Sequence, residues 1–213
     1  MTTTADPPTV LVIDDDDAIR DSLSILLGIN GYATRAYASA VDFLAAWEIP
    51  QHGCVLADVR MPGMSGIELI GELRRRGCML PVVIITGHGD VPMAVAALRA
   101  GALDFIEKPY HEQILLERLR EATDLGSRVM AEDEIRRAII ERLALLTGRE
   151  REVMTLVVEG LPNKIIAARL GISIRTVEIH RARVMEKSGA NSLSDLVRFA
   201  MLTGEGEPGQ DGG

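Results

Sequence analysis

The stretch VLVIDDDDAIR, residues 10–20, joins a short apolar run to four consecutive aspartates. An apolar run of this length that ends at polar residues is typical of a buried β-strand. Strands are expected over Val10–Ile13, Tyr32–Tyr37, Cys54–Ala57, Val82–Thr86 and Leu103–Glu107. Helical periodicity follows each of them, over Asp17–Ile29, Ser39–Trp47, Gly66–Arg76, Val91–Ala100 and His111–Asp124. Five alternating strand–helix units predict an α/β fold with a doubly wound, five-stranded parallel sheet, as in flavodoxin-like proteins.

The rest of the chain has a different pattern. Residues 142–203 contain only short helical segments separated by glycines, which predicts an all-α domain of four helices with a helix-turn-helix. Residues 125–141 are charged and have no strand signal, so we expect a linker that is at least partly helical, either separate from the fifth helix or continuing it. The Gly/Glu/Pro-rich residues 204–213 predict a flexible tail. The first domain is therefore assigned to residues 9–124 and the second to residues 142–203.

Composition narrows the class of protein. The chain has 213 residues, of which 47% are hydrophobic and 25% charged, and this excludes a disordered or collagen-like chain. The sequence has neither an apolar run of membrane-spanning length nor a signal peptide at its start, so we expect a cytoplasmic protein without membrane partners. Cys54 and Cys78 lie among apolar residues, which predicts two buried, reduced thiols rather than a disulfide or a zinc site.

The charge is unevenly distributed along the chain. Its formal net charge is −8, which taken alone argues against a nucleic-acid partner. However, residues 1–141 carry −9, residues 142–203 carry +4, and the last ten residues carry −3. The two domains are therefore expected to meet different partners, and only the second suits a polyanion.

Polar side chains follow four of the predicted strands at the point where each strand ends. They are Asp14 and Asp15, Asp58, Thr86 and Lys108. Because the carboxyl ends of parallel strands lie at one edge of the sheet, these side chains should converge there. Oxygen-only ligation by converging carboxylates suits Mg²⁺. Asp58 would then be placed to attack phosphorus, with Thr86 and Lys108 each holding a phosphoryl oxygen.

Two alternative explanations apply to these residues. Carboxylates also favour the start of a helix, and this explanation suits Asp16 and Asp17 better than it suits the set of strand-end residues. A haloacid-dehalogenase-like phosphatase also forms an aspartyl phosphate, but it requires the pattern Asp-x-Asp-x-Thr. The segment Asp58-Val59-Arg60 lacks the second carboxylate, and Asp14–Ala18 lacks the threonine.

Three segments, VLVIDDDDAIR, VLADVRMPGMSGIEL and VVIITGHGDVPMAVAALRAGALDFIEKP, resemble the receiver domain of two-component response regulators. The resemblance covers residues 9–124 and implies that Asp58 accepts a phosphoryl group from a sensor histidine kinase. It further implies that Asp14 and Asp15 form the acidic pair, and that Mg²⁺ is bound by this pair together with Asp58 and the backbone carbonyl of Arg60.

The same resemblance implies a conformational switch. Thr86 and Lys108 carry over as phosphate-binding and switch residues, and Phe105 carries over as the aromatic switch residue. Phe105 would equally suit a core position on the fifth strand. The Lys108–Pro109 peptide bond is expected to be cis, as in the family. Arg60 and His88 each lie two residues after a site residue, at positions expected to influence the lifetime of the acyl phosphate.

The basic domain has the pattern of a helix-turn-helix. Thr147 and Glu150 form a predicted capping box, and helices are expected over Asn163–Leu170 and Ser173–Lys187 with a two-residue turn between them. At 100° per residue, one side of the second helix is predicted to face the core, with Val177, His180, Val184 and Ser188. The opposite side carries Arg175, Glu178, Ile179, Ala182 and Glu186, and it suits entry into the DNA major groove. A small helical bundle with a solvated, charged face is the alternative.

Three motifs resemble the LuxR-type helix-turn-helix, namely LTGRE at 146–150, NKIIA at 163–167 and TVEIH at 176–180. The resemblance implies base contacts by Glu178, Ile179 and Ala182. It implies phosphate contacts by Asn163, Lys164, Arg175, Thr176 and Lys187. Arg181 lies nearer the core edge of its helix, but its side chain is long enough to reach phosphate, so it is predicted as a further DNA contact. His180 is expected to be packed rather than catalytic.

A receiver followed by this domain resembles the NarL/FixJ subfamily of response regulators. The resemblance implies a transcription factor, not an enzyme, whose phosphorylation relieves inhibition by the receiver and promotes homodimerisation on double-stranded promoter DNA, with RNA polymerase as a further partner. It is compatible with control of oxygen-responsive and nitrogen-fixation genes, while the regulon stays open. The alternative is a constitutive DNA-binding protein whose receiver serves only as an interaction module, and the complete acid/Thr/Lys set disfavours it.

Overall fold

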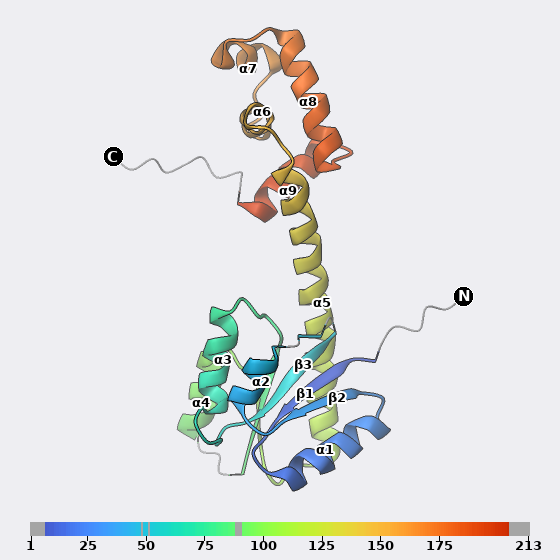
Figure 1. The fold of residues 1–213 in the computed structure, drawn as a ribbon, viewed down its shortest axis with the longest axis vertical. Coiled ribbons are helices and arrows are strands. Elements are labelled where there is room, and N and C mark those ends of the chain that lie inside the picture. Colours follow the sequence, from blue (N-terminus) through green and yellow to red (C-terminus); the bar gives the residue numbers. More distant parts are fainter. Residues whose placement is uncertain (1–6, 48, 51, 88–90, 205–213) are drawn as a thin grey trace, which may run out of the picture. The chain divides into compact units, whose positions relative to one another are not determined.

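A computed structural model describes residues 7–47, 49–50, 52–87 and 91–204 of the chain. The chain forms two compact units, Met1–Ala131 and Glu132–Gly213. Figure 1 shows a sheet with helices in the first unit and helices alone in the second. The tail predicted over residues 204–213 lies, apart from Gly204, outside the described residues, and so does the start of the chain before residue 7.

The first unit is built on five parallel strands in the order β2-β1-β3-β4-β5. The strands are β1 (Thr9–Ile13), β2 (Ala33–Tyr37), β3 (Gly53–Asp58), β4 (Val82–Thr86) and β5 (Asp104–Glu107). The helices that connect them are α1 (Asp17–Ile29), α2 (Ala40–Ala46), α3 (Gly66–Arg75) and α4 (Val91–Ala100), and α5 (Glu112–Ala144) follows the last strand. The predicted doubly wound parallel sheet is confirmed.

Side chains alternate between the two faces of the sheet, and each face has its own core. Leu11, Val55 and Ile84 point into a core with residues of α2, α3 and α4, among them Phe43 and Ile70. Their neighbours along the strands point into a second core with α1 and α5, formed by Val10, Val12, Cys54, Leu56, Val83, Ile85, Leu23, Leu27, Leu115 and Leu119. The two layers of helices flank the sheet (Figure 1). Because both faces are covered, the central strands are apolar throughout.

Polar side chains begin the helices at the edge where the strands end. The Asp16 carboxylate accepts hydrogen bonds from the backbone N–H groups of Ala18 and Ile19, so this aspartate caps α1. Ser65 and Glu68 form a reciprocal capping box at the start of α3. The helix-cap explanation for Asp16 is therefore confirmed. The loop between β1 and α1 is therefore short, whereas the loop from the end of β3 at Asp58 to the start of α3 at Gly66 is longer.

The fifth helix continues through the predicted linker, which was one of the two expectations for that segment. Helix α5 runs past Asp124 and ends at Ala144. Gly126 does not interrupt it, because this glycine lies where the helix approaches the start of β3, and an added Cβ would lie 2.1 Å from the Gly53 carbonyl oxygen. Within the described residues, none of the helices combines the length and the apolar character that a membrane span requires.

The second unit consists of the end of α5 followed by α6 (Gly148–Val158), α7 (Asn163–Leu170), α8 (Ile174–Ser188) and α9 (Leu193–Thr203). Its core contains Ile139, Leu143, Val153, Met154, Val157, Ile166, Val177, Val184 and Leu196. The four predicted helices are confirmed. Gly171 adopts a left-handed conformation at φ 64° at the end of α7, which allows the sharp turn into α8.

The close approach at Gly126 predicts a large difference between two glycine-to-alanine substitutions. Gly126→Ala should lower the free energy of unfolding by about 1–3 kcal/mol, since its Cβ would meet the Gly53 backbone. Gly71→Ala, in α3 where nothing lies within 4 Å of an added Cβ, should raise it by about 0.5–1 kcal/mol. Urea unfolding followed by the fluorescence of Trp47, the single tryptophan, measures both. Equal effects of the two substitutions would contradict this account of α5.

Candidate functional site

Four chemically active side chains meet at the carboxyl ends of neighbouring strands. Asp14 follows β1, Asp58 ends β3, Thr86 ends β4 and Lys108 follows β5. The Lys108 Nζ atom lies 2.9 Å from Asp14 Oδ2 and 3.0 Å from Asp58 Oδ1, so one ammonium group pairs with both carboxylates. The backbone N–H of Lys108 donates to the Thr86 carbonyl over 2.7 Å, which fixes the lysine beside the end of β4.

The second oxygen of each carboxylate is also held. Asp14 Oδ1 accepts a hydrogen bond from the Asp16 backbone N–H at 3.0 Å, and Asp58 Oδ2 accepts one from the Arg60 N–H at 2.6 Å. Gly66 permits the close packing behind Asp58, because an added Cβ there would lie 2.3 Å from the Asp58 carbonyl oxygen. Each carboxylate is therefore fixed in orientation, with one oxygen directed toward the lysine.

Burial makes the charges of this site interact strongly. Asp14 is 1% exposed, Asp58 7% and Thr86 1%. Burial by itself would lower the pKa of Lys108, but the hydrogen bonds and charges of Asp14 and Asp58 outweigh burial, so the pKa of Lys108 lies above its ordinary value. Lys108 therefore stays positively charged at neutral pH, and it can attract a third negative group such as a phosphoryl oxygen.

The donor atoms of the site fit a hard divalent cation. Asp14 and Asp58 each direct one carboxylate oxygen to Lys108 Nζ, so the two carboxylates lie close together. Mg²⁺ is commonly bound in proteins by one or two carboxylates together with water. Asp15, the third predicted acidic ligand, is solvent-exposed. Among the residues that the structure describes, no three His, Cys, Asp or Glu side chains are grouped to hold a metal by themselves. The protein thus offers two converging carboxylates, while the roles of Asp15 and of the Arg60 carbonyl stay predictions.

The other residues predicted for this site differ in burial, and one of them lies outside the described residues. Phe105 is half-buried on β5 and packs against the core that includes α3 and α4, so it is a core aromatic whatever its role in switching. The Lys108–Pro109 peptide bond is cis, as expected. Arg60 is exposed, and His88 lies outside the described residues.

Arg20 is a residue of this site that the sequence reasoning missed. Its Nη1 atom donates to the Asp14 backbone carbonyl over 2.5 Å, and its Nη2 atom pairs with the Asp17 carboxylate. The arginine therefore supports the loop that carries Asp14. The signal was present in the opening motif, because Arg20 lies three residues after Asp17 on the same helix, the spacing at which opposite charges pair.

In the second unit, α8 has the two faces that the helical wheel predicts. Val177, Val184 and Ser188 are buried, while Arg175, Glu178, Ile179, Ala182 and Glu186 are exposed on the other side. The Ser173 hydroxyl accepts from the Thr176 N–H and caps the helix. His180 is half-buried, and its Nδ1 atom is buried without a hydrogen-bond partner among the described residues. This histidine is packed, as expected.

The residues predicted to bind phosphate fall into two groups. Lys164 and Arg175 are exposed, at the starts of α7 and α8. Three of the others are engaged within the domain. Lys187 Nζ donates to Glu150 Oε2 at 2.6 Å and to the Leu145 carbonyl at 3.2 Å, and Arg181 Nη1 donates to Asn163 Oδ1 at 2.7 Å. These contacts give the three side chains structural partners that the sequence pattern does not predict.

Glu150 is central to the packing of α6 against α8. Its side chain is buried, accepts the Lys187 hydrogen bond and also accepts from the Thr147 backbone N–H at 2.8 Å. The hydrogen bond from Lys187, followed by those from Thr147, lowers the pKa of Glu150 to about 2. The ionised glutamate therefore holds together the start of α6 and the last turn of α8.

This pairing predicts a pH dependence for the stability of the second unit. Because the folded pKa of Glu150 is lowered from 4.5 to about 2, its contribution should be complete above pH 4.5 and lost as the pH falls toward 2. Glu150→Gln should destabilise the unit above pH 4.5, and the difference from the wild type should vanish near pH 2. Hydrogen exchange of the α6 and α8 peptides measures this. Lys187→Met should show the same trend, and a pH-independent difference in both variants would contradict the assignment.

Comparison with known proteins places both units. Residues 10–120 match the family model of the response regulator receiver domain, and residues 144–200 match that of the bacterial regulatory proteins of the luxR family. The chain is 47% identical over 195 residues to the transcriptional regulatory protein FixJ of Azorhizobium caulinodans, covering 92% of each protein. It is also 47% identical over 193 residues to the C4-dicarboxylate transport transcriptional regulatory protein DctR of Rhodobacter capsulatus, covering 90% of this chain and 98% of DctR.

A solved structure extends over most of the chain as well. The structure of the response regulator StyR matches with a TM-score of 0.78 and 41% sequence identity, covering 92% of this chain and 98% of StyR. The similarity thus runs through both units. The chain belongs to the two-component response regulators, with a receiver domain followed by a LuxR-type DNA-binding domain.

Proposed function

We propose that this response regulator is a transcription factor switched by transfer of a phosphoryl group from a sensor histidine kinase to Asp58. The observation that carries the proposal is the Asp58 carboxylate itself. It is buried, and one of its oxygens accepts a hydrogen bond from Lys108 Nζ while the other accepts one from the Arg60 N–H. It ends its strand at the same sheet edge as Thr86. A carboxylate fixed in this way beside a cation is suited to attack phosphorus.

In the proposed reaction, a carboxylate oxygen of Asp58 forms a bond to phosphorus while the bond between phosphorus and the kinase imidazole nitrogen breaks. The Lys108 ammonium holds one phosphoryl oxygen and the Thr86 hydroxyl holds another. Thr86 moves toward the phosphoryl group to make this contact, and its movement lets Phe105 change position. Asp14, Asp15, Asp58 and the Arg60 carbonyl would hold Mg²⁺, which when bound neutralises charge on the phosphoryl oxygens. The acyl phosphate is lost slowly by hydrolysis, and no substrate is turned over.

The output of the switch is binding to double-stranded promoter DNA. The exposed side of α8 enters the major groove, where Glu178, Ile179 and Ala182 read base edges. Lys164, Arg175 and Thr176 contact phosphates near the starts of their helices. The net charge of +4 over residues 142–203 supports this output, in contrast to the −9 of residues 1–141.

Phosphorylation is proposed to relieve inhibition by the receiver and to promote homodimerisation. Exposed apolar side chains on and beside α4 support dimerisation, since Val91 is 77% exposed and Leu98 51%. RNA polymerase is the further partner at the promoter, and the cytoplasm is the compartment in which kinase, DNA and polymerase meet. Relatives of equal identity are named for different systems, FixJ and C4-dicarboxylate transport, so an oxygen-responsive or nitrogen-fixation regulon is one candidate among several.

The phosphoacceptor assignment predicts the outcome of chemical phosphorylation. With acetyl phosphate and Mg²⁺, the wild-type chain should gain one phosphoryl group. Asp58→Ala should gain none, because Asp58 contacts Lys108 and also ends β3, whose neighbour β4 ends at Thr86. Asp42→Asn, an exposed change on α2, serves as the matched control and should label like the wild type. Intact-protein mass spectrometry measures the gain. Stoichiometric labelling of the Asp58 variant would overturn the assignment.

The same preparation separates a switch from a constitutive DNA-binding protein. Phosphorylated wild type should bind duplex DNA more tightly than the unphosphorylated chain, and sedimentation should show a larger species. Equal affinity of the two forms would favour the constitutive alternative, in which the receiver is only an interaction module.

The DNA contacts predict two distinguishable kinds of variant. Glu178→Ala should redistribute sequence preference, with about 1–3 kcal/mol at stake for a base pair that it contacts. Lys164→Ala should instead weaken binding to all sequences and reduce the salt dependence of the binding constant by about one unit. Binding to a randomised duplex library at several salt concentrations measures both. A change of sequence preference in the Lys164 variant, with none in the Glu178 variant, would reverse the assignment.

A further inference from the structure

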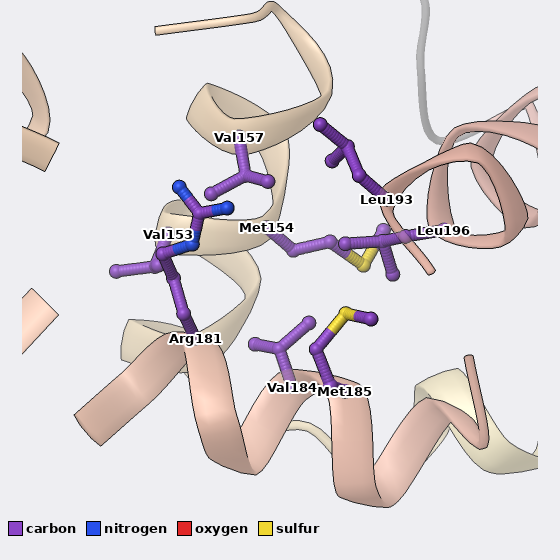
Figure 2. Close-up of a pocket in the computed structure, with 8 residues that line it drawn as sticks. All are labelled: Val153, Met154, Val157, Arg181, Val184, Met185, Leu193 and Leu196. Atoms are coloured by element: carbon purple, nitrogen blue, oxygen red, sulfur yellow. The ribbon is translucent and has the colours of Figure 1, made fainter. Parts of the chain in front are cut away.

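Arg181 occupies an unusual place for a DNA-contacting arginine. Figure 2 shows its side chain at a pocket of about 100 Å³ between α6, α8 and α9, beside Val153 and Val157. The remaining lining residues are Met154, Val184, Met185, Leu193 and Leu196. Arg181 is half-buried, and its Nη1 atom donates to Asn163 Oδ1 over 2.7 Å. The arginine therefore lies against apolar side chains of α6 and ends on the first residue of α7.

We infer that Arg181 is a positioning residue that orients the Asn163 side-chain amide for DNA, and that it does not itself contact phosphate. The inference rests on the proposed DNA-binding function. An asparagine amide has one accepting oxygen and one donating NH₂ group, whereas a guanidinium group only donates. The hydrogen bond from Arg181 therefore commits Oδ1 to the arginine and leaves the NH₂ group available to an acceptor on DNA.

The start of α7 makes this orientation consequential. The residue before Asn163 is Pro162, whose side chain makes no capping hydrogen bond, so the usual side-chain acceptor is missing at this helix start. An asparagine here could turn its oxygen toward the backbone N–H groups of its own helix, as residues of this type often do. The hydrogen bond from Arg181 prevents this alternative, because the Arg181 guanidinium on α8 donates to the Asn163 oxygen on α7.

Arg183 provides the contrast within the same helix. It lies two residues after Arg181 and is exposed, whereas Arg181 is half-buried with its guanidinium engaged. Arg181 lines the apolar pocket and Arg183 does not. Arg183 therefore suits a direct phosphate contact. The two arginines should consequently behave differently in a double-mutant cycle with Asn163, since only residues that act through one another are non-additive.

The test uses the phosphorylated full-length chain and a mixed-sequence duplex, because phosphate contacts do not depend on sequence. Arg181→Met keeps the apolar part of the side chain over the pocket and removes the donor. We expect Arg181→Met and Asn163→Ala each to weaken binding about five- to tenfold, the loss of one hydrogen bond. The double variant should bind no more weakly than Asn163→Ala alone. Arg183→Met combined with Asn163→Ala should show multiplied losses and a salt dependence reduced by about one further unit.

A second variant separates orientation from stability. Asn163→Asp keeps an oxygen for Arg181, strengthens that pair by charge, and removes the NH₂ donor. It should therefore keep or raise the thermal stability of the chain while binding DNA at least as weakly as Asn163→Ala. Retained DNA affinity in Asn163→Asp would overturn the inference.

Two further results would overturn the inference and leave the proposed function intact. One is multiplied losses in the Arg181/Asn163 double variant together with a salt dependence reduced by about one unit, since Arg181 would then contact phosphate directly. The other is unchanged binding in both single variants while wild type binds. Failure of the wild-type chain to bind any duplex, in contrast, would contradict the proposed function itself.

Discussion

The placement of one lysine between two buried carboxylates organises the receiver. Lys108 contacts Asp14, 94 residues away in the chain, and Asp58, 50 residues away. Two carboxylates this close and this buried repel each other unless a cation lies between them. The parallel order β2-β1-β3-β4-β5 supplies that arrangement, because the ends of β1, β3 and β4 and the residue after β5 lie along one edge. A phosphoryl group on Asp58 would change this charge balance.

In the second unit, polar contacts between helices hold α8 in place. The core of this unit is small, and two ion-containing contacts connect α8 to its neighbours: Lys187 with Glu150 on α6, and Arg181 with Asn163 on α7. Removing Lys187 would leave the buried Glu150 carboxylate without its cation, and the half-buried Arg181 and Asn163 add a charge-assisted hydrogen bond to a neutral amide. Both contacts constrain the position of α8. The exposed face of α8 is thereby presented on a fixed support.

Most of the fold and the receiver site could be predicted from the sequence because their determinants are local. A parallel strand must end at the same sheet edge as its neighbours, so the positions of Asp14, Asp58, Thr86 and Lys108 after apolar runs were enough to expect their convergence. The two faces of α8 could also be predicted, because the 100° step between successive residues of a helix sets the direction of each side chain locally. Pattern alone left open whether α5 ends at Asp124 or continues through the linker, and only the contact with the Gly53 backbone explains the glycine at position 126 inside that helix.

The sequence by itself thus determined the order of elements, the acidic strand ends and the exposed face of α8, since each depends on residues within a few turns or one strand. Tertiary structure alone decided which cations are engaged inside the protein. Lys187 and Glu150 are 37 residues apart, and Arg181 and Asn163 are 18 apart on different helices. Their pairing depends on how α6, α7 and α8 pack, and a helical wheel holds no information on the neighbours across that packing. An arginine or lysine near the edge of the exposed face therefore suits a phosphate contact by pattern, while the packing gives it a partner in the protein.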